Sequence, residues 1–406
     1  MQALPRDQEG AGPVDAPEEA GLAPGPCSVL TWDVDPRGYC SEHEHATRAN
    51  YGQRLAALMD CAFAGEYDEY GGARQAGGSS ASPASRHYFV PSDTLSDPVR
   101  ARAMGIAGVD DLFGGVVPHA FVATKVISHP LIDDGSAARP KGWSTRFASE
   151  VGEAVLPGYS CFSADEAARA GHAMLEAGAV RLKPVTATGG RGQIVAESAG
   201  ALEASIGAMD PAEIARTGLV LEANLEDPVT WSVGQVLVAG MVVSYCGVQR
   251  TTGDNAGQEV YGGSDLMMVR GDFDVLIAGV ASPSLRRAIE QARRYHRAVI
   301  DCYPGFFASR VNYDVAQGVD GRGEWRSGVL EQSWRVGGAT GAEIAGLEVF
   351  HRDPARGEVR ASCFEVYGPS VLVPADAIVA YQGTDSRVGP LVKYTILPED
   401  RHADAP

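Results

Sequence analysis

Apolar and polar positions follow one another along this chain with periods that predict both strands and helices. Four short apolar runs predict strands, at residues 28–32, 87–91, 179–184 and 219–222. Five segments have the character of helices, at residues 46–64, 99–106, 165–177, 201–209 and 284–300. Two strand pairs are also predicted, one within 231–245 and one formed by 307–315 and 324–334. This mixture of elements predicts an α/β (α+β) protein.

Length and composition limit the class of protein. The chain has 406 residues, which is too many for one ordinary core, so we expect two or three subdomains. Hydrophobic residues make up 45% and charged residues 21%, as in soluble globular proteins. No apolar run reaches about 18 residues, and the N-terminus lacks the pattern of a secretory signal. We therefore expect a cytoplasmic protein without a membrane span.

Charge and cysteine content narrow the possible partners. The net charge of −18 is not compensated by a basic stripe, which argues against nucleic acid. An ATP site is compatible with this charge, because such a site is local and bound magnesium brings its own positive charge. The seven cysteines are scattered and form no CxxC pair, so the sequence predicts neither a zinc site nor a disulfide framework.

Changes in composition indicate the domains. Residues 1–26 are rich in Pro, Gly, Ala and acids and predict a disordered acidic tail. Residues 27–118 follow a strand–helix order that predicts a small α/β domain. The Gly/Ser-rich stretch 71–85 inside it predicts a flexible loop.

The end of the last predicted strand is the most informative part of the chain. Side chains alternate along a strand, so Glu331, Ser333 and Arg335 share one face. An acid and a hydroxyl can hold a hard cation, and an arginine beside them can clamp a phosphate or carboxylate. Asn312 and Asp314 share a face of the preceding strand. If the strands pair, these groups converge, and opposed carboxylates repel each other unless a cation binds between them.

A second candidate site begins at Lys183, where a predicted strand ends. The following loop contains Gly189, Gly190 and Gly192, and such a loop can fold over phosphates and donate backbone N–H groups to them. The lysine precedes the glycines, so this is not a Walker A loop. An ordinary Gly-rich hairpin is the alternative interpretation.

Two further segments carry candidate nucleotide contacts. The apolar strand 219–222 runs directly into an acidic segment, where backbone groups could pair with an adenine edge and an acid could bind ribose hydroxyls. A solvated acidic loop is the alternative. Lys125 opens a short predicted helix that stops before Pro130, and it is either a phosphate contact or a surface lysine.

Three features give weaker signals. The run Glu42-His43-Glu44-His45 has metal-binding residue types, but a solvated segment is the better interpretation. The arginines between Arg286 and Arg297 predict the exposed face of a helix. Arg250 and the segment 261–264 are assigned to a Gly-rich loop that could face a substrate.

Taken in order, these features resemble the ATP-grasp superfamily. Its pattern is an early lysine, a strand lysine with a Gly-rich loop, an acidic hinge, and paired acids with an E-x-N-x-R strand. The resemblance covers about residues 119–345, and the hinge looks like that of biotin carboxylase-type members. The segments Phe121-Val122-Ala123-Thr124-Lys125 and Glu331 to Thr340 are also similar to a bacterial branch of this superfamily, the DUF3182 proteins.

The resemblance implies an ATP-grasp fold, in which two α+β lobes sandwich ATP. The small domain 27–118 would be the pre-ATP-grasp domain, followed by an ATP-grasp domain at 119–406. Within the latter, the nucleotide lobe would span about 119–240 and the metal-binding, catalytic lobe about 241–406. The implied cofactors are ATP and Mg²⁺, or Mn²⁺ in its place, and a homodimer is a reasonable assembly.

The resemblance also implies roles for single residues. The implied ATP contacts are Lys125, Lys183, Gly189, Gly190, Gly192, Glu222, Leu225 and, for the ribose, Glu226. The implied metal ligands are Asp314 and Glu331, with Asn312 and Ser333 as further candidates. The implied catalytic residues are Arg335 and Lys183, and Arg250 is a further catalytic candidate from the Gly-rich loop that could face a substrate.

The implied reaction is an ATP-dependent ligation. A substrate carboxylate attacks the γ-phosphate to give an acyl-phosphate, and an amine or thiol then displaces phosphate. Biotin carboxylase-like activation of bicarbonate is the alternative enzyme. Ser333 stands where the superfamily usually has asparagine, which favours a third hypothesis, a nucleotide-binding protein with little turnover.

Overall fold

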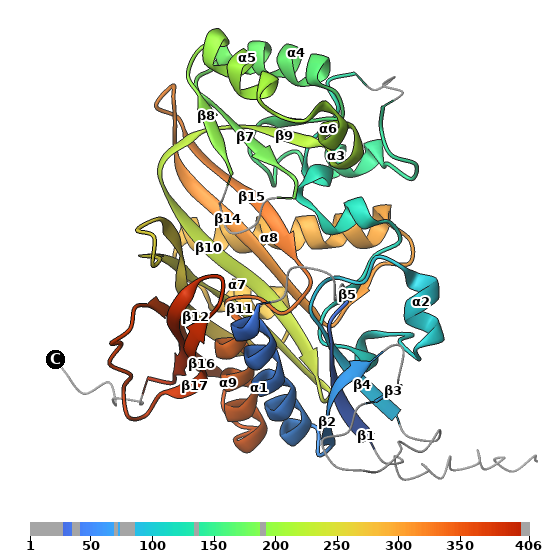
Figure 1. The fold of residues 1–406 in the computed structure, drawn as a ribbon, viewed down its shortest axis with the longest axis vertical. Helices are drawn as coiled ribbons and strands as arrows, with labels where there is room; N and C mark the ends of the chain where they lie inside the picture. Colours follow the sequence, from blue (N-terminus) through green and yellow to red (C-terminus); the bar gives the residue numbers. More distant parts are fainter. Residues whose placement is uncertain are drawn as a thin grey trace, which may run out of the picture.

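The computed structural model of the protein describes residues 27–34, 41–68, 72–73, 86–133, 138–186 and 192–398. The predicted acidic tail, most of the predicted 71–85 loop, and Gly189 and Gly190 lie outside these residues. Within them, the strands form an N-terminal sheet, a small sheet, a large eight-stranded sheet and one short two-stranded pair (Figure 1).

The N-terminal sheet has the order β3-β2-β1-β4. Its strands are β1 (Cys27–Trp32), β2 (Ala62–Asp68), β3 (Gly72–Ala73) and β4 (Arg86–Pro91). The crossover helix α1 (Glu42–Leu58) links the parallel strands β1 and β2, and α2 (Pro98–Ala103) follows β4. The helix predicted over 46–64 begins and ends earlier in the chain than expected. A capping box at Ser41 starts it, and the last predicted residues belong to β2.

The same region corrects the expectation for the cysteines. Cys27, at the start of β1, forms a disulfide with Cys61, which immediately precedes β2. Parallel pairing of β1 and β2 brings two cysteines together that stand 34 residues apart in the sequence. Spacing in the sequence carries no signal for such a contact.

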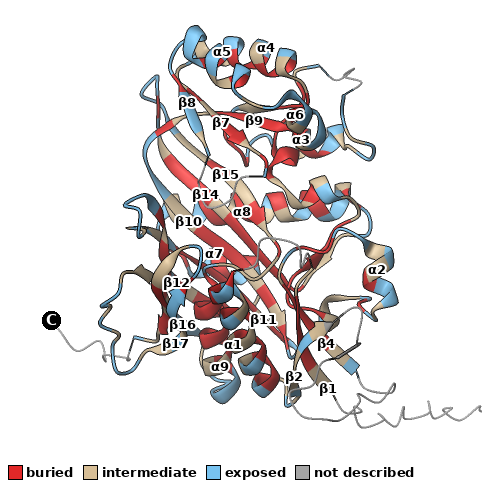
Figure 2. Cartoon of the chain, viewed as in Figure 1, coloured by how far each residue is buried: buried red, intermediate tan, exposed pale blue. Residues whose placement is uncertain are grey.

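The small sheet consists of antiparallel strands in the order β6-β9-β7-β8. The strands are β6 (Gly158–Cys161), β7 (Val180–Pro184), β8 (Ile194–Ala196) and β9 (Leu219–Ala223). Its helices are α4 (Ala164–Leu175), α5 (Ala199–Gly207) and α6 (Pro211–Thr217). Apolar side chains such as Leu182, Leu202 and Leu221 form a core between the sheet and its helices. Figure 2 shows the outer sides of α4 and α5 exposed.

The large sheet has the order β15-β14-β10-β11-β12-β16-β18-β17, and every neighbouring pair is antiparallel. Its first five strands along the chain are β10 (Leu225–Val238), β11 (Met241–Gly253), β12 (Glu259–Arg270), β14 (Arg310–Asp320) and β15 (Trp325–Ser333). The last three are β16 (Glu358–Tyr367), β17 (Ile378–Asp385) and β18 (Gly389–Ile396). The predicted hairpin of residues 307–334 is therefore confirmed as β14 and β15.

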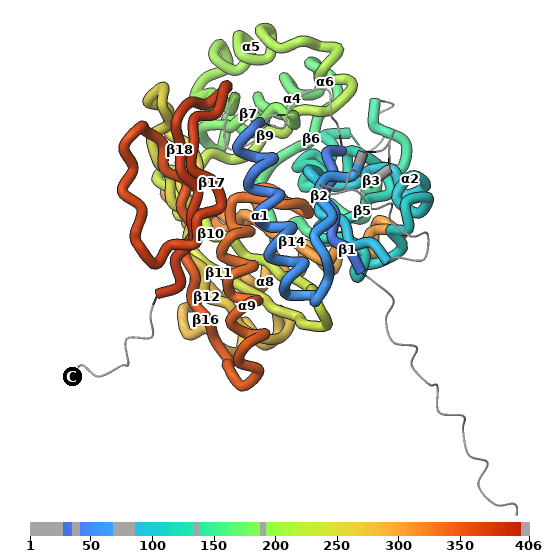
Figure 3. The backbone as a smooth tube through the Cα atoms, turned by 60° about the horizontal axis from the view of Figure 1, so that its bottom comes forward, coloured from blue at the N-terminus to red at the C-terminus, as the bar shows by residue number. Residues whose placement is uncertain are grey.

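Helices cover both faces of the large sheet. On one face, α7 (Phe273–Gly279) and α8 (Pro283–Cys302) share a core with Val233, whereas Val236 faces α1 and α9 (Thr340–Arg352) on the other. Figure 3 shows α1 and α9 side by side, although nearly 300 residues separate them in the sequence. The buried Asp385 at the end of β17 holds the start of α1, since its Oδ2 accepts hydrogen bonds from His43 N and Nδ1, each at 3.0 Å.

Several short elements connect these layers. Strand β5 (Gly115–Val116) pairs with β13 (Phe307–Ala308), and α3 (Thr145–Val151) packs against α8. The 3₁₀ turns are η1 (Val109–Asp111), η2 (Ala120–Ala123) and η3 (Lys125–Ser128). In the described ranges, no helix is both long enough and apolar enough to cross a membrane.

Two predictions of organisation need correction. A lobe boundary at about residue 240 would cut the hairpin of β10 and β11, so the strand pairing moves any such boundary to the short link between β9 and β10. Arg250 and the segment 261–264 lie in the paired strands β11 and β12, not in a loop. The glycines in these strands led to the prediction of a loop. They are needed there because a Cβ atom at Gly247, Gly262 or Gly263 would come within 3.0 Å of neighbouring backbone.

Candidate functional site

Two carboxylates lie opposite each other on neighbouring strands of the large sheet. Asp314 on β14 stands across from Glu331 on β15, and Asn312 stands across from Ser333 in the same register. Lys125 Nζ forms an ion pair with Glu331 Oε2 at 2.9 Å. We call Asp314 and Glu331 the carboxylate pair. The alternation of the strands brings together four residues that the sequence predicted to converge.

Lys125 reaches the carboxylate pair because η3 is fastened to β15. Gln332 on β15 points to the opposite side of the strand from Glu331 and donates hydrogen bonds to the carbonyls of Val122 and Thr124 at 3.0 and 2.8 Å. The Lys125 side chain is buried, with only 7% of its surface exposed. It is therefore not the surface lysine that was one of its two interpretations.

The environment of Asp314 disfavours a second negative charge. Burial and the neighbouring Glu331 carboxylate raise the pKa of Asp314 to about 7. Asn312 Nδ2 and Gln249 Nε2 oppose this rise by donating hydrogen bonds to Asp314 Oδ1 at 2.8 and 2.6 Å. Lys125 balances one of the two negative charges, so the pair still favours a further cation or a proton.

The donor types at the carboxylate pair fit a hard divalent cation. The two carboxylates offer the oxygen ligands that Mg²⁺ prefers, and Mn²⁺ uses the same ligand types. Asp314 and Glu331 are only partly buried, so a hydrated ion could reach them. The residues present therefore fit the metal expected from the sequence.

A buried ion pair lies on the far side of Asn312. Arg310 Nη2 and Glu343 Oε1 are 2.6 Å apart, and both side chains are almost wholly excluded from solvent. Tyr245 Oη contacts both Glu343 Oε1, at 2.6 Å, and Asn312 Oδ1, at 3.0 Å. We call Arg310, Glu343, Tyr245 and Asn312 the relay.

The sequence analysis missed three members of the relay and also Gln249. Arg310 stands two positions before Asn312 on β14, and Gln249 four positions after Tyr245 on β11, so strand periodicity could have assigned each pair to one face. Glu343 sits in the first turn of α9 with no sequence signal for its partners, because these lie 33 and 98 residues away.

Lys183 and Glu222 meet in the small sheet. Lys183 Nζ on β7 donates to Glu222 Oε1 on β9 at 2.6 Å, and His129 Nε2 lies 3.2 Å from Glu222 Oε2. All three side chains are buried. Burial by itself would raise the pKa of Glu222, but the Lys183 ammonium and His129 lower it to about 2. We call these residues the buried triad.

The remaining predicted nucleotide contacts do not form one cluster. Leu225 is buried and packs with Leu156 and Ala316, whereas Glu226 is exposed at the start of β10. Gly192 has a φ of 68°, a left-handed conformation that favours glycine, at the edge of the described residues. These positions neither test nor exclude the roles that the resemblance implies.

The two candidate catalytic arginines occupy different places. Arg335 lies just beyond the end of β15, and its Nε is 3.5 Å from Asp93 Oδ1, which follows β4 of the N-terminal sheet. Arg250 pairs with Asp265, donates to the carbonyl of Cys363 at 2.9 Å and stacks on Phe364. The preceding Gln249 reaches Asp314, so Arg250 points to the other side of β11. The structure does not bring Arg250 to the carboxylate pair.

The Glu42–His45 run is not simply a solvated segment, because His43 is buried against Asp385. His45 does lie between two acids, with Nε2 at 3.2 Å from Asp33 Oδ2 and Nδ1 at 3.5 Å from Glu66 Oε1. The guanidinium of Arg48 lies 3.9 Å from Glu66 Oε1 and 3.2 Å from His45 Nδ1, which disfavours a second cation there.

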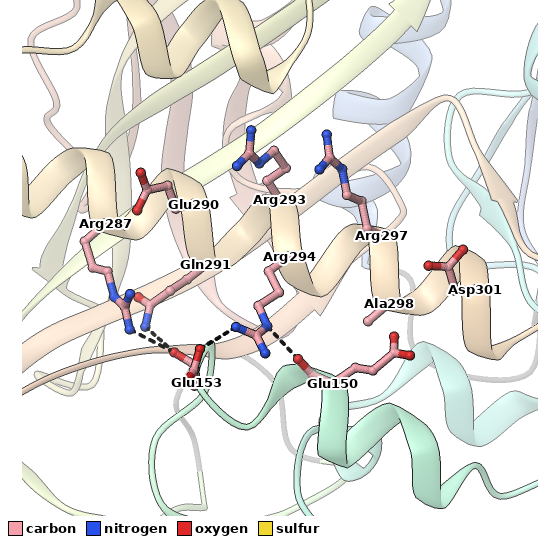
Figure 4. Close-up of a pocket in the computed structure, with 10 residues that line it drawn as sticks. All are labelled: Glu150, Glu153, Arg287, Glu290, Gln291, Arg293, Arg294, Arg297, Ala298 and Asp301. Atoms are coloured by element: carbon pink, nitrogen blue, oxygen red, sulfur yellow. Dashed lines mark hydrogen bonds and ion pairs between the residues drawn. The ribbon is translucent and has the colours of Figure 1, made fainter.

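A pocket between α8 and the α3 region (Figure 4) is lined by four arginines of α8, namely Arg287, Arg293, Arg294 and Arg297. Arg294 pairs with Glu153, and Arg287 donates to the Glu153 carbonyl at 3.1 Å. Arg293 and Arg297 instead pair with Asp274 of α7. These charges join helices to one another, and their exposure agrees with the predicted outer face of the helix.

Comparison with known proteins gives a family and a fold. A family model described as "Protein of unknown function (DUF3182)" matches residues 31–395. Among curated proteins there is no significant match. The structure resembles an N5-carboxyaminoimidazole synthetase from Staphylococcus aureus complexed with ADP, with a TM-score of 0.50 and 10% identity, over 93% of this chain and 95% of that one.

Two further solved structures are similar over comparable lengths. Biotin carboxylase from Campylobacter jejuni gives a TM-score of 0.48 and 13% identity, over 92% of this chain and 88% of that one. Phosphoribosylamine–glycine ligase from Thermotoga maritima gives a TM-score of 0.48 and 14% identity, over 92% of this chain and 93% of that one. The arrangement of a small and a large antiparallel sheet is an ATP-grasp-like α+β fold, as predicted. The chain belongs to the DUF3182 family.

Proposed function

We propose that this protein is an ATP- and Mg²⁺-dependent ligase that activates a substrate carboxylate as an acyl-phosphate for attack by an amine or a thiol. The carboxylate pair carries this proposal. Two acids face each other on adjacent strands, and one lysine forms an ion pair with the second of them. Such an arrangement would suit a divalent cation and phosphate oxygens. The Staphylococcus aureus structure of similar fold is a complex with ADP, which supports a nucleotide in the same architecture.

The residues of this chain would divide the work by position. Asp314 and Glu331 would hold the metal, which when bound neutralises phosphate charge during transfer. Lys125, already at the pair, would turn its ammonium to a phosphate oxygen. Arg335 would stabilise the transferred phosphoryl group, since it lies just beyond β15 and its present partner Asp93 is largely exposed.

The buried triad would serve the nucleotide end of the site. In the described arrangement, Lys183 is held by Glu222, so it presents a positive charge in a fixed place. Glu222 and Leu225 flank the link between the two sheets, where backbone groups would pair with adenine.

Two alternatives share the fold but not the chemistry. Bicarbonate activation of the biotin carboxylase type is one, and we rank it lower because none of the candidate residues above is assigned to bicarbonate or biotin. A nucleotide-binding protein with little turnover is the other. Ser333 favours it, because a serine oxygen replaces the usual carboxamide beside Glu331. Release of ADP in the presence of candidate acids separates this alternative from the ligase.

The first experiment is a thermal-shift titration with ATP, with and without Mg²⁺, on the wild type and Glu331→Ala. We expect a Mg²⁺-dependent rise in melting temperature that the variant loses, because binding to the folded state stabilises it. Glu324→Ala is the matched control, since Glu324 is an exposed acid beside the same hairpin. Metal-dependent ATP hydrolysis or ligation should disappear in the same variant. An unchanged response in Glu331→Ala would refute the metal assignment.

A further inference from the structure

The hydroxyl of Ser333, at the end of β15, already accepts a hydrogen bond from Arg310. Arg310 Nη1 lies 3.3 Å from Ser333 Oγ and donates to the carbonyls of Ser333 and Arg335 at 3.1 and 2.7 Å. A guanidinium at this distance uses one lone pair of the hydroxyl and places positive charge beside it. Ser333 Oγ is therefore a poor ligand for a cation.

Asn312 offers the carboxamide that position 333 lacks. It stands directly across from Ser333 in the register of β14 and β15, two positions from Asp314 on the same face. Its amide group lies between Asp314 Oδ1, at 2.8 Å, and Tyr245 Oη, at 3.0 Å. A turn of this amide about its own axis would exchange which atom, oxygen or nitrogen, faces Asp314.

The hydrogens of Tyr245 allow two arrangements of this amide. The phenol has one proton but two acceptors within reach, Asn312 Oδ1 and Glu343 Oε1. If the proton goes to Asn312, the amide directs Nδ2 at Asp314, and Arg310 alone satisfies Glu343. If it goes to Glu343, the phenol oxygen accepts from Asn312 Nδ2, and Oδ1 turns toward Asp314.

We propose that Asn312 supplies the carboxamide oxygen of the metal site in place of residue 333, and that the other three members of the relay, Tyr245, Glu343 and Arg310, hold its amide in the turned orientation. The inference rests on the proposed function, since it specifies the ligands of the same cation. Two facing oxygens of Asn312 and Asp314 repel each other without a cation, so the turned state belongs to the occupied site. The first arrangement belongs to the empty one.

The test measures Mn²⁺ affinity directly, from the electron paramagnetic resonance signal of free Mn²⁺, without nucleotide turnover. Asn312→Ala should weaken Mn²⁺ binding about tenfold or more, whereas Ser333→Ala should leave it within about twofold. Asn312→Asp keeps an oxygen at the position and should retain binding. The double variant Asn312→Ala with Ser333→Asn should regain most of the lost affinity, because it restores a carboxamide on the opposite strand.

A second measurement distinguishes positioning from simple support of the fold. Tyr245→Phe should weaken Mn²⁺ binding severalfold in the wild-type background and cause no further loss in Asn312→Ala, because the phenol acts through the amide. A purely structural role would give additive losses in the two backgrounds. Melting curves in EDTA report the stability of each variant separately.

The outcomes separate this inference from the proposed function. If Glu331→Ala leaves Mn²⁺ affinity unchanged, the metal site itself is wrong and both fall. If Glu331→Ala abolishes binding while Ser333→Ala weakens it and Asn312→Ala does not, the metal site stands and the assignment to Asn312 is overturned. If Tyr245→Phe and Asn312→Ala give additive losses of Mn²⁺ affinity, only the role of Tyr245 in orienting the amide is overturned.

Discussion

The buried triad and the carboxylate pair differ in how their charges are balanced. In the buried triad, one carboxylate meets a lysine and a histidine, and the three side chains are between 1% and 3% exposed. In the carboxylate pair, two acids share one lysine, and about a third of the Glu331 side chain is exposed. The pKa of Glu222 falls to about 2, while that of Asp314 rises to about 7.

The difference shows which cluster is complete without a ligand. Glu222 has a positive partner that compensates for its burial, so its charge is stable within the protein. Asp314 has hydrogen-bond donors but faces another carboxylate, so its charge is stable only with an added cation. Adjacent acids therefore indicate a ligand more strongly than a buried ion pair does.

The largest expected effect comes from breaking the buried triad. Lys183→Ala leaves the Glu222 carboxylate buried without its main partner, and we expect the small sheet to lose about 3–5 kcal/mol of stability. Hydrogen exchange in β7 and β9 measures this region separately from the large sheet. The same variant should also weaken ATP binding in calorimetry.

Arg326→Ala is the control for this experiment. Its ion pairs with Asp320 and Glu324 lie at the surface, so the loss should stay below about 1 kcal/mol. Adding Glu222→Gln to Lys183→Ala removes the unpaired charge and should recover part of the stability. If Lys183→Ala costs no more than the control, the triad is not a balanced buried cluster.

The next effect is a pair of opposite pH dependences. The pKa of Asp314 is raised from 3.8 to about 7 on folding, so the folded state without metal holds this proton more tightly. Its contribution favours folding at acid pH and is lost as the pH rises from about 4 to about 7. The lowered pKa of Glu222 acts in the other direction, giving stability above pH 4.5 that is lost as the pH falls toward 2.

Melting temperatures in EDTA between about pH 5.5 and about pH 8 measure the Asp314 contribution, because over most of that range Glu222 is ionised in both the folded and the unfolded state. Asp314→Asn should reduce the loss of stability with rising pH and should melt higher than the wild type at pH 8. Excess Mg²⁺ should also reduce the loss in the wild type, because a cation favours the ionised acid. Equal slopes in Asp314→Asn and the wild type would contradict the raised pKa.

How far the sequence predicts each cluster depends on the range of the contacts. The hairpin of β14 and β15 places Asp314 across from Glu331 by local alternation, so both residues could be predicted. Lys183 and Glu222 were each predicted, but as separate nucleotide contacts, because their pairing depends on β9 inserting next to β7. The connection of Tyr245 to Glu343 spans 98 residues and three-dimensional packing alone determines it.

Errors in the sequence analysis have similar physical causes. Glycines normally weaken strands, so the segment 261–264 was assigned to a loop although large-sheet neighbours require small residues there. The assignment of Arg250 to the catalytic site followed from that error. Its true position depends on the alternation of β11, which a loop does not have.

The smallest expected effect tests that reassignment. Arg250→Ala removes the ion pair to Asp265 and the stacking on Phe364, both partly exposed, and should cost about 1 kcal/mol or less. Because Arg250 points away from the carboxylate pair, Mg²⁺-dependent ATP affinity in calorimetry should stay within about twofold of the wild type. Arg335→Ala is the matched arginine variant and should lower turnover strongly if its proposed role is correct. Loss of ATP affinity in Arg250→Ala comparable to that in Glu331→Ala would place nucleotide on the opposite face of β11 and would remove the carboxylate pair from the centre of the site.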